Sequence, residues 1–145
     1  HSNGLNNVAS CKTDGNERVC NFMYNTWGAI SWTDTKSVKT NSDFTDREKL
    51  CFYYCDRNHI PSSSISSLYK ALENSPFIST YASTNPYEDF ADSFAYFMMN
   101  EHLQTTFRVL PNKSQKYDIR EKIGSPAFSE KLQFIKAKKD NLVYP

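Results

Sequence analysis

Residues 77–94 constrain the fold of this 145-residue chain more than any other segment. Asn85 is a favoured residue at the N-cap of a helix, and Pro86 suits the first helical position that follows it. Apolar side chains then recur at the spacing of one helix face, at Phe90, Phe94, Phe97 and Met98. We therefore expect a helix over about residues 86–102, with this face packed against a core.

Two acids lie one turn apart at the start of this helix. Glu88 and Asp92 are four residues apart, which puts both carboxyl groups on one face. The side that we expect to face solvent carries Asp89, Ser93 and Asn100. Acids between a core stripe and a solvent stripe indicate carboxylates at the wall of a site. Alternatively, Glu88 belongs to a capping box and reaches back to the backbone N–H of Asn85.

The same segment resembles the glutamate helix of gluzincin-type zinc metallopeptidases, in particular that of the anthrax lethal factor-like peptidases. The family pattern is Y-x-S-T-N-x-x-E-x-F-A-[ED]-x-F. Its positions are occupied here by Tyr81, Ser83, Thr84, Asn85, Glu88, Phe90, Ala91, Asp92 and Phe94. The close match covers residues 77–94, and a weaker similarity at residues 132–135 extends it over roughly the C-terminal half.

The resemblance implies a zinc-dependent endopeptidase acting on a peptide or protein substrate. In such an enzyme, Glu88 would be a zinc ligand, Tyr81 would donate a hydrogen bond to the transition state, and Asp92 would orient a ligand histidine. Taken as residues alone, Tyr81 is equally a core aromatic with a bonded hydroxyl. The alternative for Asp92 is a surface acid that mildly repels Glu88. Asp92 also stands where the family more usually has Glu, which shortens its reach by one carbon.

The helix that supplies two histidine ligands and the general base in such enzymes has no counterpart in this sequence. The chain contains no H-E-x-x-H, and its histidines are His1, His59 and His102. Because the family places that motif upstream of the glutamate helix, we expect an upstream H-E-x-x-H segment or chain to complete the zinc site. His1 is then a candidate metal ligand at the end of the severed motif. The alternative is a tag remnant or an unstructured terminal histidine.

The expected fold is mainly α, the helical C-terminal lobe of a zincin-like metallopeptidase after an irregular or short-strand N-terminal segment. Residues 1–145 would form a single domain that is an incomplete, C-terminal portion of the catalytic domain and is inactive by itself. Further helices are predicted over residues 43–54, with Leu50, Tyr53 and Tyr54 facing inward, over 65–74, and from Ser125 to about Lys139. We expect a loop over residues 1–20 and a turn over 110–113.

Composition and cysteine spacing limit the class of protein further. A net charge of +1 argues against a nucleic-acid partner, and no apolar run approaches a membrane span. Two local disulfides, Cys11–Cys20 and Cys51–Cys55, would indicate a secreted or periplasmic protein. A structural zinc site and free thiols are the alternatives for the cysteines.

The alternative function is a non-catalytic secreted binding or structural domain that keeps the helix without the zinc site.

Overall fold

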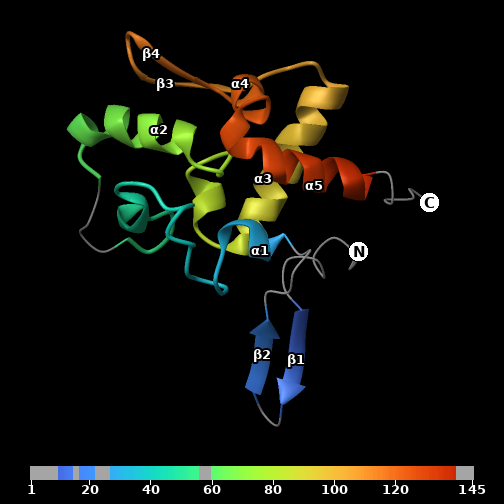
Figure 1. Ribbon diagram of the computed structural model, residues 1–145. Coiled ribbons are helices and arrows are strands. Elements are labelled where there is room, and N and C mark those ends of the chain that lie inside the picture. The colour runs from blue at the N-terminus through green and yellow to red at the C-terminus, as the bar shows by residue number, and fades with distance from the viewer. Residues whose placement is uncertain (1–9, 15–16, 22–26, 56–59, 140–145) are drawn as a thin grey trace.

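The computed structural model describes residues 10–14, 17–21, 27–55 and 60–139, and it is mainly helical (Figure 1). The helices are α1 (Gly28–Ser31), α2 (Ile65–Asn74), α3 (Pro86–His102), α4 (Ile119–Ile123) and α5 (Ser129–Lys139). Short 3-10 turns lie at Arg47–Lys49, Ser62–Ser64, Tyr81–Ser83 and Pro126–Phe128. No helix in these described ranges combines the length and apolar character that a membrane span requires.

The helix predicted over about residues 86–102 is confirmed as α3. The Asn85 side chain caps it, because its Oδ1 accepts hydrogen bonds from the backbone N–H groups of Tyr87 and Glu88, both at 3.0 Å. The predicted helix over residues 65–74 is confirmed as α2, which buries Leu68 and Leu72. The predicted C-terminal helix is also confirmed. It opens with the 3-10 turn Pro126–Phe128 and continues as α5.

Two antiparallel hairpins replace segments for which we expected a loop and a turn. Strands β1 (Ser10–Asp14) and β2 (Glu17–Asn21) pair so that Cys11 lies directly opposite Cys20. Strands β3 (Arg108–Asn112) and β4 (Gln115–Asp118) form the second hairpin, and their register shifts between Val109 and Asn112. The short-strand character predicted for the N-terminal segment is therefore confirmed, whereas the predicted loop over residues 1–20 is wrong where β1 and β2 lie.

The helix predicted over residues 43–54 is wrong. Only the 3-10 turn Arg47–Lys49 forms there, and the backbone of Asp46 and Tyr54 is left-handed, with φ angles of 67° and 52°. A disulfide between Cys51 and Cys55 closes a tight loop, with the two Cα atoms 5.7 Å apart. Tyr53 and Tyr54 are 71% and 103% exposed instead of facing inward, whereas Leu50 does pack against the core. The cross-link and the left-handed residue favour this loop over helical continuation.

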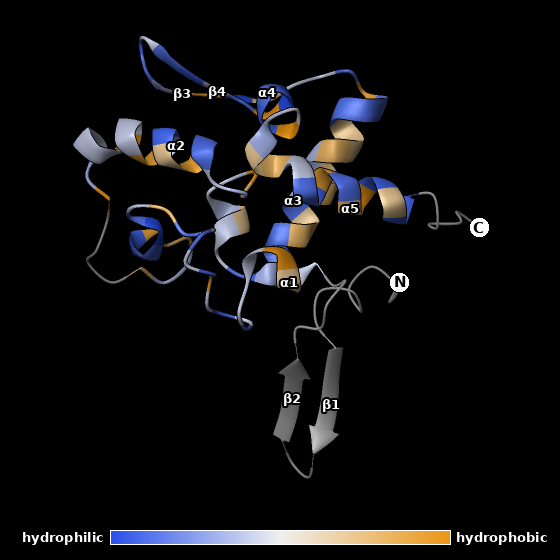
Figure 2. Ribbon diagram, in the orientation of Figure 1, coloured by the Kyte–Doolittle hydropathy of each residue, from blue (hydrophilic) through white to orange (hydrophobic). Residues whose placement is uncertain are grey.

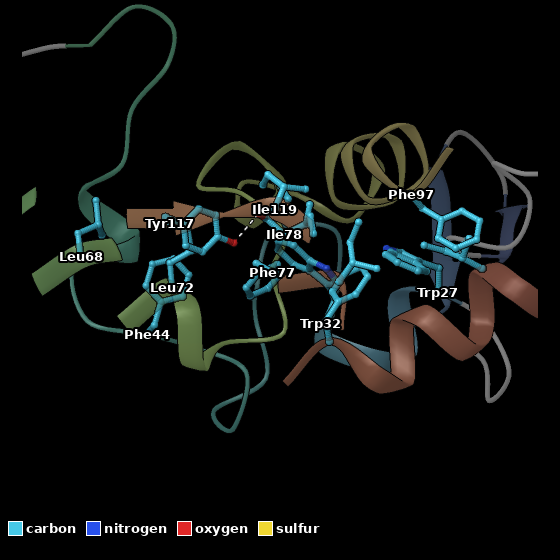
Figure 3. Close-up of a cluster of buried hydrophobic side chains, with 14 residues drawn as sticks. Trp27, Trp32, Phe44, Leu68, Leu72, Phe77, Ile78, Phe97, Tyr117 and Ile119 are labelled. Carbon is cyan, nitrogen blue, oxygen red and sulfur yellow. Dashed lines mark hydrogen bonds between the residues drawn. The ribbon is translucent and has the colours of Figure 1, made fainter. Parts of the chain in front are cut away.

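The hydrophobic core lies between α2, α3, α5 and the segment that carries α1. Figure 2 shows helices with hydrophobic stripes beside hydrophilic ones, as expected for helices that cover a core on one side. Tyr117 of β4 crosses this core, and its buried hydroxyl donates to the carbonyl of Ile78 at 2.6 Å (Figure 3). Burial raises the pKa of the Tyr117 hydroxyl, which therefore stays a donor. The second hairpin is thus joined to the segment that leads into residues 79–85.

A buried ion pair joins α3 to α5 and corrects the prediction that Asp89 and Ser93 face solvent. Both residues are 0% exposed. The Lys131 ammonium lies 2.8 and 2.6 Å from the two carboxylate oxygens of Asp89. The indole N–H groups of Trp27 and Trp32 donate to Asp89 Oδ2 at 3.1 and 2.9 Å. Because Asp89 has these donors, a carboxylate can occupy a position in the core.

A second buried lysine, Lys122 of α4, closes the C-terminal end of α2. Its ammonium donates to the carbonyls of Leu72 and Glu73 at 2.8 Å each and also to that of Ser75. These are carbonyls that a helix end leaves without a partner inside the helix. Burial lowers the pKa of Lys122 to about 7, and repulsion from Lys131 acts in the same direction.

Candidate active site

The structure brings Tyr81, Glu88 and Asp92 together at the N-terminal end of α3. Tyr81 begins the 3-10 turn Tyr81–Ser83, which packs directly against α3. The chain then reverses at the Asn85 cap, and the first turn of the helix carries Glu88 back beside Tyr81. The Glu88 carboxylate there raises the pKa of the Tyr81 hydroxyl. The seven-residue spacing between the two residues thus brings their side chains near each other, because the turn packs against α3.

The Glu88 carboxylate does not complete a capping box on its own helix. The Asn85 side chain accepts from the amide N–H groups of Tyr87 and Glu88, which is one half of that motif. Among the hydrogen bonds of the described residues, none joins the backbone N–H of Asn85 to the Glu88 side chain. The Glu88 side chain is half-buried and raises the pKa of the Tyr81 hydroxyl.

Asp92 braces the turn that carries Tyr81. Ser79 Oγ donates to Asp92 Oδ2 at 2.6 Å, and the same Ser79 Oγ accepts from the backbone N–H of Ala82 at 2.9 Å. Burial raises the pKa of Asp92, and the negative charge of Glu88 adds to this rise, while the hydrogen bond from Ser79 opposes it. One carboxylate oxygen of Asp92 is thus engaged by the loop, which is a role that sequence reasoning did not anticipate.

Tyr81 is surrounded by aromatic side chains of the Cys51–Cys55 loop. Its ring meets those of Phe52 and Tyr53 edge to face, with centroid separations of 5.1 and 6.4 Å. Hydrogen bonding with Tyr53 raises the pKa of the Tyr81 hydroxyl, and burial and hydrogen bonding with Glu88 raise it further. The hydroxyl therefore keeps its proton at neutral pH and can act as a hydrogen-bond donor but not as a base.

The described residues do not form a zinc site by themselves. They contain no group of three or more His, Cys, Asp and Glu side chains that could hold a metal. Catalytic zinc needs three protein ligands, so a site that included Glu88 would need at least two more. His1 and His59 lie outside the described residues. His102 ends α3, about 21 Å along the helix from Glu88, and cannot share an ion with it.

Two features of the site were missed by sequence reasoning. Ser79 links Asp92 to the Tyr81 turn, and no pattern marks it in advance. Phe52 and Tyr53 contact Tyr81 because the Cys51–Cys55 loop folds over the turn. A signal for these two did exist, since three aromatic residues stand between two closely spaced cysteines.

Comparison of the chain with known protein families, with curated proteins and with solved structures found no match. The function is therefore argued from the residues of the site and from their contacts.

Proposed function

We propose that this chain is the C-terminal catalytic portion of a secreted or periplasmic zinc-dependent endopeptidase. Glu88 supplies a zinc ligand, and Tyr81 supplies the hydrogen bond that stabilises the oxyanion of a peptide substrate. The observation that carries the proposal is the packing of the Tyr81 turn against α3, which places the Glu88 carboxylate where it raises the pKa of the Tyr81 hydroxyl. This arrangement would bring a carboxylate ligand and a neutral phenol donor within reach of one reacting carbonyl. The Cys51–Cys55 disulfide supports an oxidising compartment.

Two histidine ligands and the general base would come from an H-E-x-x-H segment outside these 145 residues, because the sequence contains no such motif. His1 remains a candidate ligand. When held by Glu88 and two histidines, zinc would polarise the substrate carbonyl and lower the pKa of a bound water.

Glu88, Tyr81 and Asp92 would each have a different role in the reaction. The Glu88 carboxylate holds its position on the first turn of α3, whose start is fixed by Asn85. Tyr81 donates its hydroxyl proton in a hydrogen bond to the oxygen on which negative charge develops, and it does not give up the proton. Asp92 keeps the turn in place through Ser79, and its second carboxylate oxygen could accept the N–H of a ligand histidine.

The second candidate is a non-catalytic secreted binding or structural domain. The observation in its favour is the exposure of three consecutive aromatic side chains, Phe52, Tyr53 and Tyr54. Exposed aromatic groups of this kind are common where a protein binds a partner. In this alternative, the proximity of Glu88 to Tyr81 has only a structural role.

Metal analysis of the Glu88→Gln variant tests the proposal. The protein is prepared together with the H-E-x-x-H segment, and bound zinc is measured after exhaustive dialysis. We expect Glu88→Gln to lose zinc because an amide is a much poorer zinc ligand than a carboxylate. Glu48→Gln, on the exposed 3-10 turn Arg47–Lys49, is the matched control and should keep its zinc. Full zinc occupancy in Glu88→Gln with unchanged affinity would refute the ligand assignment.

A further inference from the structure

The Cys51–Cys55 loop presents an exposed aromatic surface that continues into the candidate site. Phe52 is 40% exposed and Tyr53 is 71% exposed. Each of their rings meets the half-buried ring of Tyr81 edge to face, at interplanar angles of 83° and 74°. Rings in this geometry attract one another but do not cover each other as stacked rings do. Phe52, Tyr53 and Tyr81 therefore form one aromatic patch that is partly open to solvent.

The loop that carries this aromatic patch is held in place by covalent and polar contacts. The disulfide closes residues 51–55, and the left-handed backbone of Tyr54 completes the bend. Before the loop, Arg47 donates through Nη1 to the carbonyl of Ser83 at 3.2 Å. Ser83 ends the turn that Tyr81 begins. A ligand of the aromatic patch would thus meet rings that are already in position, which limits the conformational entropy lost on binding.

The chemistry of the loop indicates what kind of group it can bind. Residues 50–55 include no charged side chain. Arg47, which precedes the loop, is already paired with Asp43 at 2.6 Å. An uncharged aromatic surface gains most from covering an apolar group, and an aromatic group adds ring-to-ring attraction. The aromatic patch therefore favours an aromatic or large apolar side chain over a small or a charged one.

The position of Tyr81 places this surface next to the reacting group of a substrate. The ring centroids of Phe52 and Tyr53 lie 5.1 and 6.4 Å from that of Tyr81. Neighbouring Cα atoms of a peptide are only 3.8 Å apart, so a substrate with its carbonyl at Tyr81 carries its adjacent side chains to the patch. Tyr54 is fully exposed, and the ring contacts of the described residues include none between Tyr54 and Tyr81.

We propose that the aromatic patch is a substrate subsite that selects an aromatic or large apolar side chain next to the scissile peptide bond. The inference rests on the proposed function and names the substrate class of the same site. Tyr53, the more exposed of the two loop residues in the patch, is the main specificity-determining residue. The substrate then covers rings that the free chain leaves in contact with water.

The first test is kinetic and uses the zinc-loaded protein that includes the H-E-x-x-H segment. Two peptide substrates differ only in Phe or Ala beside the scissile bond, and the ratio of their kcat/KM values is measured. We expect a preference for Phe, which Tyr53→Ala should lower about 10-fold. Any general loss of activity through Tyr81 affects both substrates equally and cancels in the ratio.

Tyr54→Ala is the matched control for this kinetic test, because Tyr54 lies in the same loop outside the aromatic patch. It should leave the ratio unchanged. A ratio that is unchanged in Tyr53→Ala, or a protein that does not prefer Phe over Ala, would overturn the proposal.

The second test measures binding without turnover, on the 145-residue chain. Its tyrosine rings are labelled with ¹³C, and the Tyr53 and Tyr54 signals are assigned by NMR with Tyr53→Phe and Tyr54→Phe. The peptide acetyl-Gly-Phe-Gly-amide should shift the Tyr53 signals and leave those of Tyr54 in place, whereas the peptide with Ala in place of Phe should shift neither.

The outcomes of the binding test separate the subsite from the proposed function. Unmoved Tyr53 signals with the Phe peptide would overturn the proposal. Shifts caused only by a cello-oligosaccharide would overturn it in favour of a sugar ligand. Failure of the proposed function is a separate result, because it appears as unchanged zinc binding in Glu88→Gln and does not alter these shifts.

Discussion

Removal of Lys131, on α5, should destabilise the protein strongly. Lys131 is fully buried and gives Asp89 its countercharge at 2.6 Å. Lys131→Met leaves the Asp89 carboxylate buried with only its neutral donors. Breaking a buried ion pair on one side costs about 3–5 kcal/mol. The ammonium also lies 4.2 Å from the ring centroid of Phe77 and 5.2 Å from that of Trp27, so two cation–π contacts are lost with it.

Replacement of Asp89 should lower the free energy of unfolding further than removal of Lys131 does. Asp89→Leu leaves an uncompensated buried ammonium, at about 3–5 kcal/mol. It also leaves the indole N–H groups of Trp27 and Trp32 without an acceptor, at about 1–3 kcal/mol each. The total, roughly 5–11 kcal/mol, is comparable to the whole stability of an ordinary domain. The double variant Asp89→Leu, Lys131→Met removes both charges and keeps the cost of the unpaired indole N–H groups and of the Ser93 hydroxyl, which donates to Asp89 at 3.5 Å. It should therefore be more stable than Asp89→Leu alone.

Urea unfolding followed by circular dichroism measures these free energies of unfolding. Lys138→Met is the matched control, because Lys138 lies on the same helix, is partly exposed and has only a ring contact with Phe134 at 5.7 Å. Its cost should stay within about 1 kcal/mol. The reasoning fails if Lys131→Met is as stable as the control, or if the two changes at positions 89 and 131 are simply additive.

Three further changes probe other parts of the structure. Tyr81→Phe should lower kcat by roughly 10²–10³ and leave bound zinc unchanged, whereas a loss of stability with normal kcat would make Tyr81 a core residue only. Burial alone would raise the pKa of Asp118, but hydrogen bonds from Arg108, Thr106 and two backbone N–H groups outweigh it and lower this pKa from 3.8 to about 2. The stabilisation of the folded protein by the ionised Asp118 carboxylate is therefore present above pH 4 and is lost as the pH falls toward 2. Asp118→Asn should flatten the fall in melting temperature over that pH range. An unchanged acid profile would contradict this account. Lys122→Met should cost about 1–3 kcal/mol in urea unfolding, since the carbonyls of Glu73 and Ser75 lose the ammonium as a donor. A neutral effect would show that water replaces the ammonium there.

The parts of the fold that were predicted are those whose signals are local. Asn85 followed by Pro86 specifies the start of α3, and Ser75 followed by Pro76 specifies the end of α2. The approach of Tyr81 to Glu88 was expected from the resemblance, and the cap geometry explains it. One local signal went unused: Asp118 with Glu121 three residues later is typical of a helix start, and α4 begins there with Asp118 as its cap.

The parts that were missed depend on contacts between distant residues. Periodicity alone places Asp89 on a polar face of α3, and its burial follows from Lys131, 42 residues later, and from the indoles about 60 residues earlier. The failed helix over residues 43–54 has the same kind of cause. Leu50, Tyr53 and Tyr54 have helical spacing, but the disulfide and the left-handed Tyr54 favour a loop. Helical spacing in a sequence carries no information about a disulfide, because the disulfide forms only when two side chains meet in the folded chain.

Adjacent positions on α3 have unrelated duties, and this matters for genetic selection on the protein. Glu88 faces Tyr81, whereas Asp89, the next residue, is sealed in the core among Lys131 and two indoles. A screen that selects for activity alone would score both positions as intolerant and would suggest two catalytic acids. A parallel screen for cellular abundance would separate them, because substitutions of Asp89 should deplete the folded protein while Glu88→Gln should leave its abundance unchanged.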